Sequence, residues 1–262
     1  MTLTSIFKRT AVSAAVLAFS FGAAQATDLF DRDRGSMKDA PVERADRPSC
    51  SANVALTTDY VFRGESQSDE HAAIQGGFDC EYSFFYAGVW ASNINFDAPA
   101  EADIELDIYG GVKHKFGQVE VDLGVIYYSY PDAKDSAAGE ELDYVEFKVG
   151  LSGDVTENVS VGGTLYYSDD YFSEQGETLT YEGSISIGLG THGHFSPTFS
   201  ALVGQVDFQE PVFGGVDFAY WNAGVEIGLG EKFALDLRYW DTDVNNNPLL
   251  EERFVATLSS SW

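Results

Sequence analysis

The sequence predicts an all-β fold, namely a transmembrane antiparallel up-and-down β-barrel of about twelve strands that follows an N-terminal signal peptide. Three observations predict it. Apolar and polar residues alternate along stretches after Cys50, long polar breaks alternate with short turns between these stretches, and no segment after the signal peptide could form a transmembrane helix. A membrane protein without such a helix must be a closed barrel, because only closure satisfies every backbone group in lipid.

The first 26 residues have the features of a secretory signal peptide. Lys8 and Arg9 supply the positive end, and an apolar run from Ala11 to Ala24 follows. This run is shorter than the roughly 20 apolar residues that a transmembrane helix needs. The small-x-small sequence that ends at Ala26 indicates cleavage after that residue.

Residues 27–49 differ from both neighbours. They contain six acids, five bases and few apolar residues. We expect them to form a charged flexible tail in the periplasm, with a folded plug as the alternative. Residues 50–262 are then the outer-membrane barrel.

Twelve stretches have the length and the alternation of barrel strands. In the fifth, Val119, Val121 and Leu123 share one face, whereas Glu120 and Asp122 lie on the other, because successive side chains of a strand point to opposite faces. The stretches are residues 52–63, 72–82, 84–95, 102–115, 118–130, 142–152, 158–168, 178–190, 197–207, 217–229, 232–241 and 252–262.

The lengths of the breaks between these stretches indicate whether the polar face of the sheet lines a lumen or faces outward. Long, mostly acidic breaks at 63–71, 95–101, 131–141, 169–177, 208–216 and 242–251 alternate with short turns at 82–83, 116–117, 153–157, 192–196 and 230–231. Six long loops on one rim and five turns on the other are typical of an outer-membrane barrel with both termini in the periplasm. A Greek-key sandwich has no reason to alternate in this way.

The charge excludes nucleic acid as a partner. Removal of the signal peptide leaves 13 basic residues against 42 acidic ones, a net charge of −29, which repels phosphate backbones. The acidic loops attract divalent ions and cationic solutes. They are either plain solvated surface or a surface that divalent ions bridge to anionic lipopolysaccharide.

Strand parity places charged side chains inside the barrel. The expected pore-lining residues are Asp59, Asp103, Glu105, Asp107, Glu120, Asp122, Glu146, Lys148, Glu182, Glu226, Asp236 and Arg238, and Asp79, Glu81, Arg63 and Lys113 join them. Rings of carboxylates favour cations. The alternative is that these acids only keep the inner face polar and pair with the four bases.

Twelve strands spaced about 4.8 Å and tilted about 40° enclose a backbone radius of roughly 12 Å. Inward side chains remove about half of that radius. The result is a narrow channel for small solutes, or a closed barrel if tyrosines and loops fill the interior.

The two cysteines have the spacing of a cross-strand pair. Cys50 precedes the first strand and Cys80 ends the second, and the hairpin that would place them opposite each other is centred at residue 65, inside a long loop. In the oxidising periplasm we expect a disulfide between them. Two unpaired thiols are the alternative, because a register slip would separate them.

Few residues suggest other chemistry. His192 and His194 share a turn and could hold a metal weakly, although a plain surface position is the simpler interpretation. No histidine has a serine partner by strand position, so we expect no catalytic residues, no metal and no cofactor. Trp262 ends the chain and resembles the signal that the barrel-assembly machinery reads, or serves as an interfacial girdle residue.

Several segments resemble a known family. These are residues 53–67 (NVALTTDYVFRGESQ), 73–78 (AIQGGF), 85–93 (FYAGVWASN), 105–111 (ELDIYGG) and 123–131 (LGVIYYSYP). They are similar to the TorF-like family of predicted porins, and the resemblance covers essentially the whole chain after the signal peptide. It implies an outer-membrane porin-like barrel but transfers no binding site.

Together these observations predict a protein of the Gram-negative outer membrane that conducts small hydrophilic solutes passively, with a preference for cations. The alternative is a closed barrel with a structural or adhesive role through its acidic extracellular loops. The expected partners are outer-membrane lipid, lipopolysaccharide, the barrel-assembly machinery and small solutes.

Overall fold

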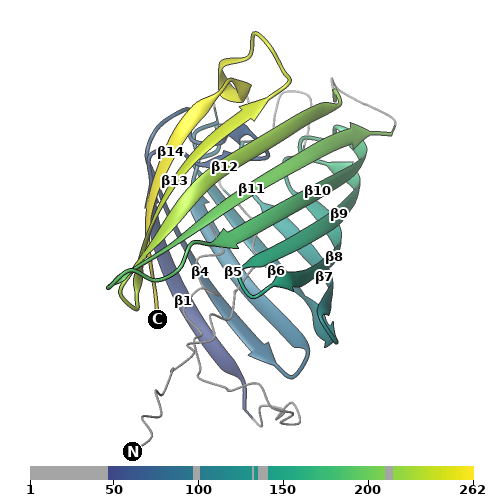
Figure 1. The fold of residues 1–262 in the computed structure, drawn as a ribbon. Coiled ribbons are helices and arrows are strands. Elements are labelled where there is room, and N and C mark those ends of the chain that lie inside the picture. Colours follow the sequence, from purple (N-terminus) through teal and green to yellow (C-terminus); the bar gives the residue numbers. More distant parts are fainter. Residues whose placement is uncertain (1–46, 97–100, 132, 135–140, 210–214) are drawn as a thin grey trace, which may run out of the picture.

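The computed structural model describes residues 47–96, 101–131, 133–134, 141–209 and 215–262. Within them, twelve antiparallel strands form a closed barrel in up-and-down order, with the first strand paired to the last (Figure 1). The strands are β1 (Ser49–Thr57), β4 (Ala73–Tyr82), β5 (Phe85–Asn93), β6 (Ile104–Phe116), β7 (Val119–Ser129), β8 (Tyr144–Thr156), β9 (Val159–Tyr171), β10 (Gly176–Gly188), β11 (Phe195–Phe208), β12 (Phe218–Leu229), β13 (Phe233–Thr242) and β14 (Arg253–Ser261). The predicted fold class is confirmed. The expected signal peptide and most of the expected tail lie outside the described residues.

The first predicted strand, 52–63, is wrong in its second half. β1 ends at Thr57, and Val61–Phe62 (β2) instead pairs with Glu65–Ser66 (β3) as a separate small hairpin. Arg63 and Gly64 both have a positive φ, of 50° and 86°. A type I′ hairpin turn has a positive φ at both central positions, so the chain reverses at Arg63-Gly64 rather than continuing along the wall.

The connections gather on two rims, which we call the loop rim and the turn rim. Among the described residues, the loop rim carries 58–72, 94–96, 101–103, 130–131, 133–134, 141–143, 172–175, 209, 215–217 and 243–252, and the turn rim carries 83–84, 117–118, 157–158, 189–194 and 230–232. β1 begins and β14 ends at the turn rim (Figure 1). A 3-10 helix, η1 (Pro248–Leu250), lies in the last loop.

One connection departs from the predicted alternation. β9 and β10 stay paired up to Tyr171 and Gly176 through a register shift, so only four residues connect them at the loop rim, whereas six lie in the opposite turn at 189–194. The polar pair Asp169-Asp170 is typical of a loop, yet it continues strand β9 beyond the apolar part of the wall.

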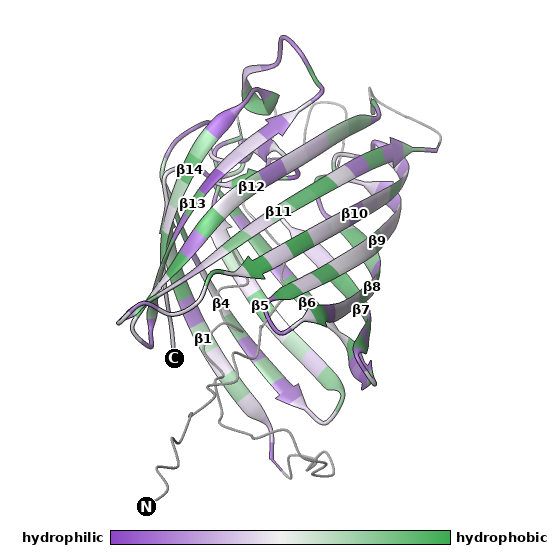
Figure 2. Ribbon diagram, in the orientation of Figure 1, coloured by the Kyte–Doolittle hydropathy of each residue, from purple (hydrophilic) through white to green (hydrophobic). Residues whose placement is uncertain are grey.

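Hydrophobic and hydrophilic residues alternate along the strands (Figure 2), and since large apolar side chains are exposed while polar ones are buried, the outer wall is apolar and the inner wall is polar. Leu56, Ile74 and Val203 are among many apolar side chains exposed on the outside. Exposed aromatic residues collect at the turn rim, namely Tyr82, Phe84, Phe85, Phe116, Phe195, Phe233 and Trp262. No helix among the described residues is long and apolar enough to span a membrane.

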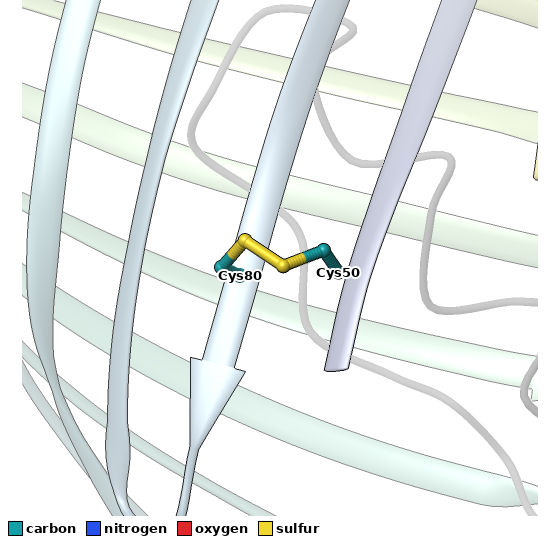
Figure 3. The surroundings of a disulfide bond; sticks show 2 residues. All are labelled: Cys50 and Cys80. Carbon is teal, nitrogen blue, oxygen red and sulfur yellow. A yellow bond between two sulfur atoms is a disulfide. The ribbon is translucent and has the colours of Figure 1, made fainter. Parts of the chain in front are cut away.

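Cys50 and Cys80 lie directly opposite each other on β1 and β4 and form a disulfide, with their Cα atoms 4.1 Å apart (Figure 3). Both positions share the parity of outward residues such as Leu56 and Ile74, so the bridge lies on the outside of the wall near the turn rim. Trp262 exchanges backbone hydrogen bonds with Ala52 of β1, which completes the seam between the first and last strands.

Candidate functional site

The interior of the barrel is crossed by the segment between β1 and β4. We call this segment, residues 58–72, the plug loop; it contains the β2–β3 hairpin. Its ends are attached to two neighbouring strands, and its tip contacts β8 and β9, which lie on the opposite wall in the strand order of the barrel. The tip also lies against the wall beside it, because a Cβ added at Gly64 would meet Thr242 at 2.5 Å and Tyr220 at 3.1 Å. The plug loop therefore spans the lumen near the loop rim.

Arg63 attaches the tip of the plug loop to the far wall. Its guanidinium donates two hydrogen bonds to Glu146, at 2.7 and 2.9 Å, and a longer one to the hydroxyl of Tyr171 at 3.3 Å. The ring centroids of Tyr166 and Tyr171 lie 5.0 and 5.8 Å from Cζ of Arg63, and Phe62 lies 4.8 Å away. Such distances allow cation–π attraction.

The ion pair is buried, with 3% of the Arg63 side chain exposed and none of Glu146. Burial by itself lowers the pKa of Arg63, but the adjacent charge of Glu146 raises it further, so the pKa stands well above its usual value. Removing one partner of a buried pair costs about 3–5 kcal/mol, because the other charge is left uncompensated. The pair therefore holds the plug loop in place once formed.

A second ion pair anchors the base of the plug loop. Arg253 of β14 donates to Asp59 at 3.0 Å and to the carbonyl of Pro248 in η1 at 2.8 Å. The hydroxyls of Ser66 and Ser68 donate to the other oxygen of Asp59, at 2.7 and 2.9 Å. The base is therefore bound to the barrel independently of Arg63.

Aromatic side chains fill the space around the plug loop. Tyr60 packs edge-on against Trp90, with centroids 5.3 Å apart, and donates to Glu105 at 3.1 Å. Burial raises the pKa of Tyr60 well above its usual value. Tyr128 and Tyr144 stack at 4.3 Å. The buried cluster comprises Tyr60, Ala73, Trp90, Ile94, Ala102, Ile126, Tyr128, Tyr130, Leu142, Tyr144 and Tyr166.

The lumen becomes wetter toward the turn rim. Lys148 and Asp122 form an ion pair at 2.6 Å with 11% and 25% of their side chains exposed, and Tyr86 donates to Asp122 at 2.8 Å. Arg238 binds Asp236 at 2.7 Å and donates to Asn222 at 2.7 Å. The side chains of these two ion pairs are several times more exposed than those of Arg63 and Glu146. Solvent therefore reaches this part of the lumen, which we call the lower lumen, and is excluded around the plug loop.

The structure divides the predicted pore-lining residues into three sets. Glu105, Asp107 and Glu146 are buried beside the plug loop, and Asp59 is buried within that loop rather than on the wall. Those that line the half-buried lower lumen are Glu120, Asp122, Lys148, Glu182, Glu226, Asp236 and Arg238. Asp103 precedes β6 and is exposed at the loop rim.

Each of the four inward bases that parity predicted has an acidic partner. Lys113 pairs with Glu81, and the pairs of Arg63, Lys148 and Arg238 are described above. The sequence interpretation missed Arg253, although its parity is opposite to that of the outward residue Phe254. His192 and His194 lie exposed in the turn at 189–194.

Two solved structures with a similar fold are porins. The NanC porin is 12% identical, with a TM-score of 0.51, and the alignment covers 82% of this chain and 99% of that one. The KdgM porin is 9% identical, with a TM-score of 0.53, and the alignment covers 81% and 98%. At this identity the likeness concerns the fold alone.

A comparison with curated protein sequences found no match. One sequence family matches the chain, and its description does not confirm the resemblance to the TorF-like family. The match covers residues 43–262 and therefore most of the chain. The chain belongs to the family described as bacterial protein of unknown function, Gcw_chp.

Proposed function

We propose that this chain is a porin-like channel of the Gram-negative outer membrane for passive diffusion of small hydrophilic solutes, with a preference for cations. The observation that carries the proposal is a closed barrel with an apolar outer wall and a charged lumen that solvent enters. A soluble barrel would place its apolar residues inside, whereas this arrangement suits lipid outside and water within. Similarity in fold to the NanC and KdgM porins supports the same reading.

The preference for cations follows from the excess of inward acids over inward bases. By strand parity twelve inward acids face four inward bases, and each of these bases has one acidic partner, so acids remain in excess. Carboxylates in a narrow lumen concentrate cations and exclude anions.

The proposal includes the route to the membrane. The signal peptide is cleaved after Ala26, the charged tail remains in the periplasm, and Trp262 is presented to the barrel-assembly machinery. The exposed aromatic residues of the turn rim would then lie at the periplasmic interface with lipid, and the acidic loops would face lipopolysaccharide.

One observation favours a second candidate. The plug loop and the aromatic cluster bury the upper lumen, as expected of a closed barrel that acts only through its surface. Planar-bilayer recordings distinguish the two. We expect the full chain to conduct rarely, and a variant in which residues 60–67 are replaced by a short Gly-Ser linker to conduct steadily. If that variant, folded by circular dichroism, passes no current, the channel proposal is wrong and the closed barrel stands.

A further inference from the structure

The wall residues around the guanidinium of Arg63 all lie outside the plug loop. Tyr128 comes from β7, Glu146 from β8, and Tyr166 and Tyr171 from β9, which are three adjacent strands. We call these four residues the cation cage. Tyr128 donates to Glu146 at 3.1 Å and so helps to fix the carboxylate. Arg63, which occupies the cation cage in this structure, belongs to the plug loop, as does the neighbouring ring of Phe62.

The chemistry of the cage selects a planar cation. The carboxylate of Glu146 accepts two parallel hydrogen bonds, which match the fork of a guanidinium. The rings of Tyr166 and Tyr171 add attraction to a positive charge. An alkylammonium could form only a point contact with Glu146, an anion would be repelled by its carboxylate, and a neutral sugar would bring no positive charge to pair with it.

Arg63 fits the cage incompletely. Among the residues that the structure describes, neither Nε of Arg63 nor the hydroxyl of Tyr166 has a hydrogen-bond partner, although both atoms are buried. Buried polar groups without partners are unfavourable. A free cation can turn within the cage to use such groups, whereas Arg63 is tethered to the plug loop.

The attachment of the plug loop is consistent with an occupant that can leave. The Asp59–Arg253 pair holds the base of the loop to β14, while the Arg63–Glu146 pair holds the tip to β8. Losing the Arg63–Glu146 pair would release the guanidinium from β8, while the Asp59–Arg253 pair would still hold the base of the loop to β14.

We propose that the cation cage is the binding site for the guanidinium group of a small permeating solute, and that Arg63 occupies it as an internal ligand until such a solute displaces it. The inference rests on the proposed channel function and names the solute class. The cage then serves both as the solute site and as the attachment of the plug loop.

The proposal is tested by removing the Arg63 side chain and adding a free guanidinium compound in its place. In planar bilayers, Arg63→Ala empties the cage and is expected to conduct more than the unaltered chain. Methylguanidinium added to the loop side should then block that current. The concentration for half block should rise at least about tenfold in Arg63→Ala/Glu146→Gln, because the bidentate carboxylate is lost. Arg238→Ala removes an inward arginine without emptying the cage, so methylguanidinium should not produce this block there.

The outcomes separate this inference from the channel proposal. If the Arg63→Ala current is blocked equally with Glu146 and with Gln at position 146, the cage is not the site, although the channel stands. If Arg63→Ala and the linker variant of residues 60–67 both stay silent while folded, the channel itself is wrong. Block by methylammonium at the same concentration as methylguanidinium would also overturn the guanidinium assignment.

Discussion

Glu65 carries a charge that depends on the position of the plug loop. It lies in β3, partly buried, and the positive charge of Arg253 acts on it. Burial raises its pKa from the ordinary 4.5 to about 6, and the positive charge of Arg253 only partly opposes this rise. A released loop would return Glu65 to water and to its ordinary pKa.

The first prediction is that acidification closes the pore. Because the pKa is higher in the docked state, the docked loop binds more protons between pH 6 and 4.5, so lowering the pH favours docking and raising it opposes docking. From pH 7 to pH 5 the docking equilibrium should shift roughly eightfold toward the docked state. Open probability in planar bilayers measures the shift.

Glu65→Gln is the control for this prediction. It keeps the shape of the side chain and removes the titration, so the open probability should be low and should change little between pH 7 and pH 5. A wild-type channel whose open probability rises on acidification would contradict the assignment.

At the scale of elements, the disulfide connects the beginning of β1 to the end of β4. The two cysteines are 30 residues apart in sequence, and the bridge closes the loop that contains the plug loop. The bridge restricts the unfolded chain more than it changes the paired strands, since their register already places the two residues opposite each other.

The second prediction concerns this bridge. Cys50→Ser/Cys80→Ser should lower the free energy of unfolding by about 3 kcal/mol, as expected for a closed loop of this size. Urea unfolding of the purified barrel in lipid vesicles measures the change. Reductant should weaken the unaltered protein and leave the double variant unchanged; equal midpoints for the two proteins without reductant would contradict the prediction.

The elements were largely predictable because period-two alternation specifies a strand and its two faces at once. Val119, Val121 and Leu123 face outward as the alternation predicts, and the constant sum of residue numbers placed Cys50 opposite Cys80. Prediction from the sequence failed where contacts between residues far apart in the sequence determine the path of the chain. Val61 and Phe62 continue the pattern of β1, but the Arg63–Glu146 pair, which joins residues 83 positions apart, draws them into the lumen.

The candidate site was predictable in its residues and not in its arrangement. Parity identified Glu146 and Arg63 as inward, yet it gave no reason to pair them rather than any other acid and base. The contacts of Tyr166 and Tyr171 with Arg63 could not be predicted either, because nothing in the sequence distinguishes these two tyrosines from other strand residues. Closure of the sheet brings them together.

At the scale of the whole molecule, the two rims should face different compartments. Asn246 is exposed in the last loop of the loop rim, and Glu231 is exposed in the final turn of the turn rim. The third prediction is that, in intact cells, an impermeant thiol reagent labels Asn246→Cys and not Glu231→Cys. Both should react once the outer membrane is permeabilised. Labelling of Glu231→Cys in intact cells would reverse the proposed orientation.

The fourth prediction concerns the charge of the whole lumen. In the Arg63→Ala background, where the plug loop is released, the reversal potential in a KCl gradient should show a preference for potassium. The preference should be larger at about 0.01 M salt than at 0.1 M, because screening lengths fall from about 30 to 10 Å. Replacing Asp103, Glu105 and Asp107 with Asn, Gln and Asn should reduce it, because these substitutions remove one carboxylate from the loop rim and two from the lumen.

A matched control removes two charged side chains of the lumen without changing its net charge. Lys113→Ala/Glu81→Gln deletes one positive and one negative side chain that pair with each other, so the net charge of the lumen is unchanged. If the preference depends on the excess of acids rather than on any carboxylate, this double variant should keep the reversal potential while the triple variant shifts it toward zero. A shift of equal size in both variants would show that local geometry near each carboxylate, rather than the summed charge, determines selectivity. An anion-selective pore in the Arg63→Ala background would contradict the charge argument altogether.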